Sequence, residues 1–361
     1  MKYETCLIVG EREVSASQPT YFIADIASNH DGEIERARDL VWIAKEAGAD
    51  AAKFQHFKAN QLVSDAGFKN LSTTAGHQDR WKKSVFKVYE ENEYRREWDA
   101  QLHQECLKAD IHFMTSPYDI SAVDSVEPFV TAYKIGSGDI TTPEMLEHIS
   151  SKSQPIFLAS GASSLEDVKR AVKTILKKSP RLALMQCNTN YTGSVENFHH
   201  INLNVLNTFA EIWPKMVLGL SDHTPGHATV LAAVTLGARC VEKHFTDNKE
   251  RNGPDHPFSM DPTSWKEMVN RTREVEQALG DGIKRIQDNE RETAIVQRRG
   301  LYLKRRMAAG EMITDSDLMS LRPASPEVFF PYEREQLFGQ KLLHSKEEGD
   351  PLFRSDILIG T

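Results

Sequence analysis

The chain has 361 residues, of which 27% are charged and 40% hydrophobic, a balance typical of a globular protein with one large and one small domain. Its formal net charge of −8 argues against a general nucleic-acid binder, because contact with the phosphate backbone needs an excess of lysine and arginine. A small anionic substrate is not excluded, since a few convergent lysines can create a local positive pocket.

We expect a cytoplasmic protein without a membrane anchor. Residues 1–5 lack the basic and then apolar layout of a signal peptide, and no apolar run approaches the roughly 18 residues of a membrane helix. Paired or CxxC spacing is missing among the cysteines, which favours small buried thiols in a reducing compartment; they are Cys6, Cys106, Cys187 and Cys240.

The large domain is predicted to be a closed barrel. Residues 1–14 indicate a hairpin that precedes it, with Gly10-Glu11 at the turn. From residue 20 to about 280, short apolar runs alternate with longer amphipathic segments such as 34–47, 95–109 and 165–176. The apolar runs predict eight strands, at 21–26, 51–55, 112–115, 132–135, 156–159, 183–187, 217–220 and 239–243. Eight successive strand–helix units favour a (β/α)8 TIM barrel over an open doubly wound sheet.

One segment inside the barrel region departs from this alternation. Residues 57–94 are polar and poorly patterned, and a connection of that length in a compact domain is commonly a lid or a binding segment. Because it follows the second strand, we expect it to reach over the barrel mouth.

The character of the chain changes after Gly280. We predict a large domain over residues 1–282, a charged linker over 283–297 and a small domain over 298–361. Within the small domain, residues 309–318 and 348–357 share a pattern of glycine, acid, apolar residue and Ser-Asp at an offset of 39. This repetition indicates two half-motifs related by pseudo-symmetry, and a chance match is the alternative.

Two histidines carry the strongest functional signal. His223 and His244 stand 21 residues apart, each closing an apolar run, with a helix-forming stretch between them. That separation is about one strand–helix repeat, so both side chains would lie at the carboxyl ends of adjacent parallel strands, where barrel active sites are built. Two imidazoles there suit a divalent metal with open coordination positions. The alternative is a pair of buried histidines with structural hydrogen bonds.

Further polar residues end the other predicted strands. Lys53 and Lys134 are the most informative, because a lysine buried in a barrel strand is costly unless an anion compensates it. Both would face one mouth, which suggests a phosphate or carboxylate ligand. Alternatively, each lysine pairs with an acid such as Asp25 or Asp139 and only supports the barrel. Backbone N–H groups of Gly136-Ser137-Gly138 and Ser160-Gly161 could also hold an anion.

Six motifs resemble those of the sialic acid synthases, which make nonulosonic acids from phosphoenolpyruvate and an N-acylated aminosugar. In chain order they are Asn29-His30-Asp31-Gly32, Lys53-Phe54-Gln55, Tyr133-Lys134-Ile135-Gly136-Ser137-Gly138-Asp139, Gly219-Leu220-Ser221-Asp222-His223, Glu242-Lys243-His244-Phe245-Thr246 and Gly253-Pro254-Asp255-His256. The tail from residue 300 on, with Ala309-Gly310-Glu311 and Leu321-Arg322-Pro323, resembles the antifreeze-like (β-clip) domain that closes those enzymes.

The resemblance implies roles for individual residues. His223 and His244 would ligate Mn²⁺ or Mg²⁺, and Arg322 from the antifreeze-like domain of a partner subunit would reach the acyl group of the sugar, in a domain-swapped homodimer. The residues implied to hold phosphoenolpyruvate are Lys53, Lys134, Ser116, Ser137, Ser160 and Ser221. Those implied to contact the sugar or complete the site are Asp25, Asp139, Asp255, Gln55, Asn188, Thr189, Asn190 and Tyr191. We assign catalytic roles to Asp25, Lys53, Lys134 and Asp139.

Two positions depart from the family pattern. The first strand ends in Asp25 where the family generally has glutamate, which draws the carboxylate back by about 1.5 Å, roughly one C–C bond. The ligand-binding asparagine of the family aligns nearest Thr189, with Asn188 and Asn190 beside it, so the sequence leaves open which of the three serves.

The expected activity is therefore the metal-dependent condensation of phosphoenolpyruvate with an open-chain N-acylated aminosugar, such as N-acetylmannosamine or a bacterial diacetamido sugar. The products would be a nine-carbon 2-keto acid and phosphate, released by C–O cleavage. One alternative is the same chemistry on a phosphorylated or simple aldose. Another is a non-catalytic sugar-binding homologue.

Overall fold

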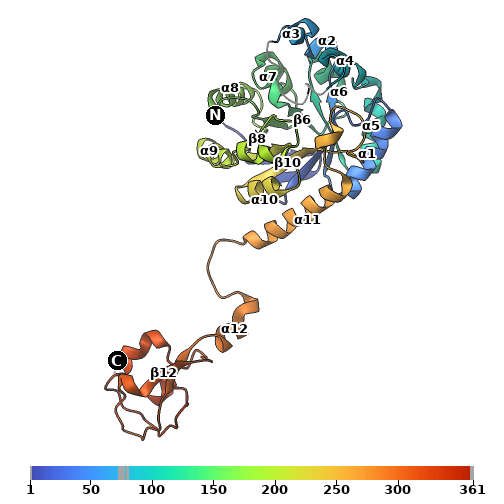
Figure 1. The fold of residues 1–361 in the computed structure, drawn as a ribbon. Helices are drawn as coiled ribbons and strands as arrows, with labels where there is room; N and C mark the ends of the chain where they lie inside the picture. The colour runs from blue at the N-terminus through green and yellow to red at the C-terminus, as the bar shows by residue number, and fades with distance from the viewer. Residues whose placement is uncertain (1, 72–77, 79–80, 358–361) are drawn as a thin grey trace. The chain divides into compact units, whose positions relative to one another are not determined.

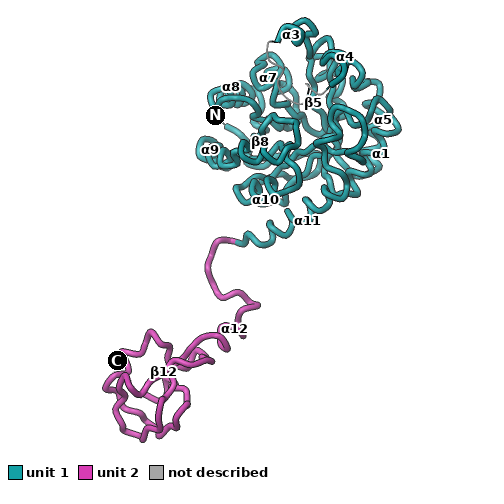
Figure 2. Tube along the Cα trace, viewed as in Figure 1, with its two compact units in different colours: residues 1–280 teal, residues 281–361 magenta. Residues whose placement is uncertain are grey.

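The computed structural model describes residues 2–71, 78 and 81–357. The chain divides into two compact units, residues 1–280 and 281–361 (Figure 2). Each unit has its own buried apolar core, so each is described by itself. Among the described residues, no helix has the length and apolar character needed to cross a membrane.

The first unit is a closed barrel of parallel strands in the order β10-β3-β4-β5-β6-β7-β8-β9, ringed by helices (Figure 1). Its strands are β3 Tyr21–Asp25, β4 Ala51–His56, β5 His112–Pro117, β6 Ala132–Ile135, β7 Ile156–Ala159, β8 Leu182–Cys187, β9 Val217–Asp222 and β10 Ala238–His244. The predicted TIM barrel is confirmed, and the predicted strand bounds agree to within two residues. The largest differences, of two residues, are at β5, which continues through Ser116 and Pro117, and at β9, which continues through Ser221 and Asp222.

Helices cover the outside of the barrel and bury apolar side chains against it. They are α1 Ile34–Glu46, α5 Asp99–Lys108, α6 Ile120–Val126, α7 Pro143–Ser150, α8 Leu165–Ile175, α9 Val205–Ile212, α10 Ala228–Thr235 and α11 Pro262–Leu279. Helix α8 shows how the sequence sets a helix start. Ser164 accepts a hydrogen bond from the Asp167 N–H, and the Asp167 carboxylate accepts one from the Ser164 N–H, a capping box that satisfies two otherwise unpaired N–H groups.

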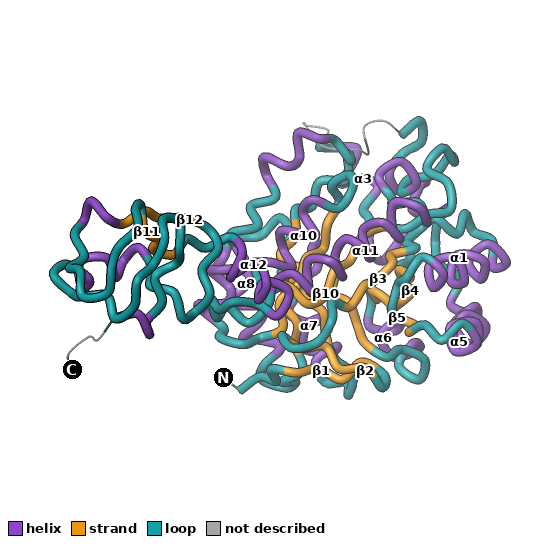
Figure 3. Tube along the Cα trace, turned by 90° about the horizontal axis from the view of Figure 1, so that it is seen from below, coloured by secondary structure: helices purple, strands orange, loops and turns teal. Residues whose placement is uncertain are grey.

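The predicted N-terminal hairpin is present as β1 Cys6–Val9 paired antiparallel with β2 Arg12–Ser15 (Figure 3). Its turn uses Gly10 at φ +59°, a conformation that favours glycine. The hairpin side chains Leu7, Val9 and Val14 share one buried cluster with residues inside the barrel, so the hairpin closes the end opposite the carboxyl ends of the strands.

The segment predicted as a long polar loop contains three short helices, α2 Ala59–Leu62, α3 Asp65–Lys69 and α4 Val85–Glu91. Two of them begin with serine caps: Ser64 accepts from the Gly67 N–H and Ser84 from the Lys87 N–H. Residues 72–77 and 79–80 of this segment lie outside the described residues. The segment is therefore more regular than its composition indicated.

The second unit contains α12 Arg291–Val296 and the antiparallel pair β11 Gly300–Leu303 and β12 Leu318–Leu321. The sequence repeat corresponds to a real pseudo-twofold arrangement. The Gly310 N–H donates to the Leu342 carbonyl, and its counterpart 39 residues on, the Gly349 N–H, donates to the Leu303 carbonyl. Met307 and Lys346, themselves 39 residues apart, exchange both backbone hydrogen bonds. The pseudo-symmetry expected from the sequence is confirmed.

Candidate active site

The polar floor of the site follows from the alternation of side chains along the barrel strands. Residues such as Ile23, Ala51, Met114, Ala132 and Cys240 fill the apolar interior of the barrel. Two residues further along the same strands, the inward positions become polar because side chains on one face of a strand recur every second residue. These positions hold Asp25, Lys53, Ser116, Lys134 and Glu242, and all five are buried.

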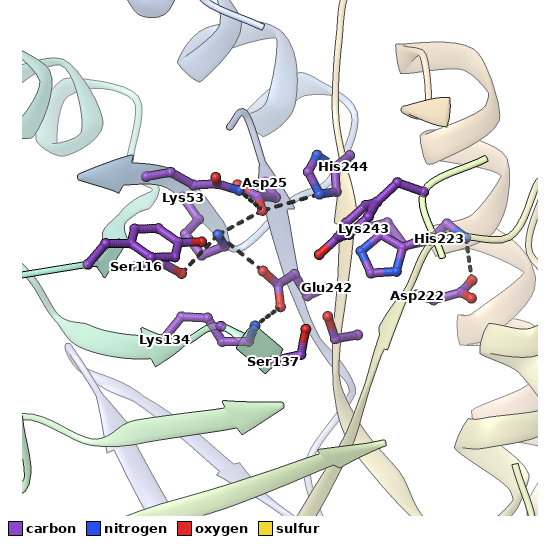
Figure 4. A pocket seen from close by; sticks show the side chains of 15 residues that line it. Asp25, Lys53, Ser116, Lys134, Ser137, Asp222, His223, Glu242, Lys243 and His244 are labelled. Carbon is purple, nitrogen blue, oxygen red and sulfur yellow. Dashed lines mark hydrogen bonds and ion pairs between the residues drawn. The ribbon is translucent and has the colours of Figure 1, made fainter. Parts of the chain in front are cut away.

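A buried carboxylate joins the two lysines (Figure 4). Glu242 Oε1 lies 3.2 Å from Lys53 Nζ, and Glu242 Oε2 lies 2.7 Å from Lys134 Nζ. Asp25 Oδ2 contacts Lys53 Nζ at 2.7 Å and accepts a hydrogen bond from Gln55 Nε2 at 2.9 Å. Lys53 therefore pairs with Asp25, as one interpretation of the sequence held, whereas among the described residues Lys134 pairs with Glu242 and not with Asp139.

The electrostatics of this cluster favour the charged forms of Glu242 and Lys53. Burial alone would raise the pKa of Glu242, but the charges of Lys134 and Lys53 outweigh it and hold that pKa well below its usual range. Burial opposes the charge on Lys53 as well, while Asp25 and Glu242 raise its pKa. The ammonium and carboxylate groups thus stabilise one another's charged forms.

We call the cavity above this cluster the inner pocket; its volume is about 360 Å³. It is lined by Asp25, Lys53, Gln55, Ser116, Tyr118, Lys134, Gly136, Ser137, Tyr191, Ser221, Asp222, His223, Glu242, Lys243 and His244. The lining contains three lysines (Lys53, Lys134 and Lys243) and three carboxylates (Asp25, Asp222 and Glu242), so with neutral histidines its formal charges sum to zero. An anion that enters this pocket would need a further positive charge for balance.

The two histidines meet on the wall of the inner pocket, with ring centroids 5.5 Å apart. His223 Nδ1 lies 2.9 Å from the Asn188 carbonyl oxygen, which can only accept, so Nδ1 carries the hydrogen and Nε2 keeps its lone pair. Burial lowers the pKa of His223, and burial lowers the pKa of His244 to about 3. Both imidazoles are consequently neutral at pH 7, the state in which they ligate metals.

The donor set fits a divalent cation with open coordination positions. His244 Nδ1 is buried and has no hydrogen-bond partner among the described residues, and Asp25 Oδ2 lies 3.6 Å from His244 Nε2. In the part of the chain that the structure describes, no group of three or more histidine, cysteine, aspartate or glutamate side chains is arranged to hold a metal. A metal bound by His223 and His244 would therefore take its remaining ligands from water or substrate.

A second cavity adjoins the inner pocket, and we call it the outer pocket; its volume is about 980 Å³. Its wall includes apolar and aromatic side chains from the segment that follows β4 and contains α2, α3 and α4: Phe57, Leu62, Val63, Phe68 and Tyr89. Two carboxylates, Asp139 and Asp255, also line it, and burial raises the pKa of each to about 6. Within the described residues, the lining of this pocket contains no lysine or arginine.

Asp255 is held in place by a hydrogen bond from the loop that follows β3. Its Oδ2 accepts a hydrogen bond of 3.1 Å from the Ser28 backbone N–H. The next residue, His256, is fully buried between Thr246 Oγ1 at 2.7 Å and Asp31 Oδ1 at 2.9 Å. The loop after β10 is thus tied to the loop after β3, which fixes the Asp255 carboxylate at the pocket.

Most residues predicted for the site line one or both pockets, but four do not. Ser160 is buried, and its hydroxyl donates to Gln186 Oε1 and accepts from the Cys187 N–H. The Asn188 side chain donates to the His200 carbonyl, and Asn190 Oδ1 accepts within its own turn from Thr192. Arg322 belongs to the second unit. Of the three residues left open by the sequence, Thr189 lines the outer pocket, where its hydroxyl donates to Ser137 Oγ at 3.0 Å.

The structure adds residues that the sequence analysis did not select. Glu242 was within a quoted motif but had no role, although its place two residues before His244 on one strand puts both on the inward face. Lys243, the residue between them, also lines the inner pocket and forms a buried ion pair with Asp222. Tyr118, two residues after Ser116, lines both pockets, and the same period-two spacing was the available signal.

The model of the NeuB family matches residues 40–284, and the model of the SAF domain matches residues 298–358. The chain belongs to the NeuB family. The resemblance to sialic acid synthases with an antifreeze-like domain is thereby confirmed.

Similarity extends over almost the whole chain. It is 34% identical over 356 residues to the N,N'-diacetyllegionaminic acid synthase of Legionella pneumophila, covering 96% of each chain. It is 29% identical over 346 residues to the N-acetylneuraminate-9-phosphate synthase of Homo sapiens, covering 94% of this chain and 93% of that one. A crystal structure of N-acetylneuraminic acid synthetase from Leptospira borgpetersenii with citrate superposes with a TM-score of 0.68 at 25% identity, covering 80% of this chain and 94% of that one.

Proposed function

We propose that this protein condenses phosphoenolpyruvate with an open-chain N-acylated aminosugar to give a nine-carbon 2-keto acid and phosphate. The observation that carries the proposal is the placement of two buried lysines and two neutral imidazoles around one cavity that opens into a second. The relatives named as legionaminic and neuraminic acid synthases support a reaction of this kind.

The inner pocket is proposed to hold phosphoenolpyruvate. Lys53 and Lys134 offer charged donors for its phosphate and carboxylate, and Ser116, Ser137 and Ser221 line the same space. Because the lysines are already balanced by carboxylates, the added negative charge calls for a divalent cation. This need for balance supports a metal at His223 and His244 on electrostatic grounds.

His223 and His244 would hold Mn²⁺ or Mg²⁺. When bound, the ion supplies Lewis-acid stabilisation of negative charge on the aldehyde oxygen of the acceptor. The protein supplies the positioning: His223 is fixed by the Asn188 carbonyl, and Asp25 is fixed by Lys53 and Gln55.

The outer pocket is proposed to hold the aminosugar. Its lining combines apolar side chains for acyl and methyl groups with two carboxylates for hydroxyl groups, and its described residues offer no cation for a phosphate. This composition favours an acceptor without a phosphate. In the proposed domain-swapped homodimer, Arg322 of the second unit would contact the acyl group from the partner subunit, and we place the enzyme in the cytoplasm.

The proposed condensation proceeds in two steps. C3 of phosphoenolpyruvate attacks the aldehyde carbon, so that a C–C bond forms and the aldehyde oxygen takes a proton. Water then adds at C2, and phosphate leaves with its bridging oxygen as the C2–O bond breaks. Asp139, with its pKa near 6, can hold or accept a proton near neutral pH at the edge of the outer pocket.

A direct assay tests the proposal. The protein is incubated with Mn²⁺, phosphoenolpyruvate and one acceptor at a time: N-acetylmannosamine, its 6-phosphate, a diacetamido-trideoxy sugar or a simple aldose. Inorganic phosphate and 2-keto acid are then measured. Turnover fastest with an unphosphorylated N-acyl sugar is expected. Faster turnover of the 6-phosphate or of the simple aldose would show that the acceptor belongs to that class instead. Metal-dependent sugar binding without phosphate release would indicate a non-catalytic homologue.

A further inference from the structure

Tyr118 stands at the junction between the two pockets. Six residues line both cavities: Gln55, Tyr118, Gly136, Ser137, Tyr191 and His244. Gln55 already donates to Asp25, whereas the Tyr118 hydroxyl makes no hydrogen bond to any residue that the structure describes. A polar group at this junction lies where a ligand in the inner pocket would meet a ligand in the outer one.

The aromatic ring of Tyr118 is fixed by its backbone and by a neighbouring ring. Its backbone N–H donates to the His56 carbonyl at 3.1 Å, which continues the pairing of β5 with β4 past the end of the strand. The ring packs edge-on against Phe57, with centroids 6.2 Å apart and planes at 81°. The hydroxyl is consequently presented by a fixed ring, a requirement for a donor that acts without reorganisation.

Gly136 makes room for the hydroxyl. Its φ of −63° and ψ of 152° are open to any residue, so the backbone does not call for glycine there. A Cβ at this position would lie 3.3 Å from Tyr118 Oη and 3.7 Å from Asp139 Oδ2. The glycine is thus explained by the close approach of the phenol and not by backbone conformation.

We propose that Tyr118 is a catalytic residue that donates a hydrogen bond to the aldehyde oxygen of the acceptor as the new C–C bond forms. The inference rests on the proposed function, because it places the reacting aldehyde where the two pockets meet. Burial raises the pKa of the phenol well above its usual value, so the O–H is retained across the neutral range. The hydrogen bond strengthens as negative charge develops on that oxygen, so its main effect falls on kcat.

Tyr118→Phe tests the inference, because it removes one oxygen and keeps the ring contact with Phe57. We expect kcat to fall about 10²- to 10³-fold, with the KM values for phosphoenolpyruvate and acceptor changed by about threefold or less. The matched control is Tyr133→Phe, at a tyrosine outside both pockets whose hydroxyl donates to the Val123 carbonyl at 3.0 Å. That variant should lose thermal stability and keep the parent kcat.

Gly136→Ala supplies a second, independent variant. It should displace the hydroxyl and lower kcat in the parent, and it should add little when combined with Y118F, since both changes remove one interaction. A kcat for Y118F within about twofold of the parent, an effect on acceptor KM alone, or additive losses in the double variant would each overturn the inference. Absence of turnover by the parent with every acceptor would instead overturn the proposed function, and this inference with it.

Discussion

Asp25 and Lys53 are partners in register on the neighbouring strands β3 and β4, and their side chains form a 2.7 Å ion pair inside the barrel mouth. The same Asp25 oxygen also accepts from Gln55 and lies 3.6 Å from His244 Nε2. One carboxylate oxygen therefore connects the lysine cluster to the proposed metal ligands.

Lengthening this side chain should disturb the site. In Asp25→Glu the carboxylate moves by about 1.5 Å, and the buried surroundings cannot keep all three contacts. We expect kcat/KM to change at least about tenfold for one acceptor relative to another, with a loss of about 1–3 kcal/mol in the free energy of unfolding. Asp25→Asn keeps the length and removes the charge, and so separates the two effects. Kinetics identical to the parent would show that the position tolerates either acid.

Neutralising Glu242 should strengthen anion binding in the site and lower the free energy of unfolding of the protein. Glu242→Gln leaves Lys53 and Lys134 short of a shared partner, and loss of one member of a buried charge cluster costs about 3–5 kcal/mol. Inorganic phosphate should restore Tm in this variant by occupying the freed lysines. The control is Glu333→Gln, which breaks a pair with Arg354 in the second unit and should gain nothing specific from phosphate. Equal phosphate stabilisation of both variants would contradict the expectation.

Removing either imidazole should abolish metal-dependent turnover. His223→Ala and His244→Ala are each expected to lower turnover by about 10³-fold or more and to weaken Mn²⁺ binding in calorimetry, because two ligands leave no substitute in the described site. A chelator should inactivate the parent reversibly. His148→Ala, at a partly exposed histidine paired with Asp124, serves as the control and should keep full activity. Unchanged Mn²⁺ affinity in both pocket variants would show that the ion binds elsewhere.

Acid should destabilise the barrel through His30. Burial lowers the pKa of His30 to about 4, from 6.5 in an unfolded chain, so the unfolded state binds the extra proton between these values. Stability is therefore lost as pH falls from about 6.5 towards 4, by about 3 kcal/mol for this residue alone.

Urea unfolding of His30→Asn and the parent at pH 7.5 and 4.5 measures this effect. Asparagine can still accept from the Gly32 N–H, as His30 Nδ1 does, but it does not titrate. The free energy of unfolding of the variant should be lower than that of the parent at pH 7.5. Because the variant should lose less stability at pH 4.5, the difference between the two proteins should be smaller there. Parallel losses in both proteins would mean that His30 titrates normally.

The barrel strands could be located from sequence because their central residues are short apolar runs buried on both faces, which polar loops bound on each side. Strand ends were less well defined. Ser221 and Asp222 belong to β9, yet polar residues after an apolar run are typical of a loop. The segment 57–94 was predicted as irregular because its helices have four to seven residues, too short for a helical period to stand out.

What the sequence determined by itself is what recurs locally: eight strand–helix repeats, the 21-residue spacing of His223 and His244, and the 39-residue repeat of the small domain. These patterns can be recognised in the sequence because each depends only on residues within one or two secondary-structure elements. Only the tertiary structure decided that Glu242 bridges Lys53 and Lys134, and that Tyr118 stands between two pockets. Those relations arise when β10 pairs with β3 and closes the barrel. Closure sets side chains from distant strands around one axis, and no local pattern encodes those distances.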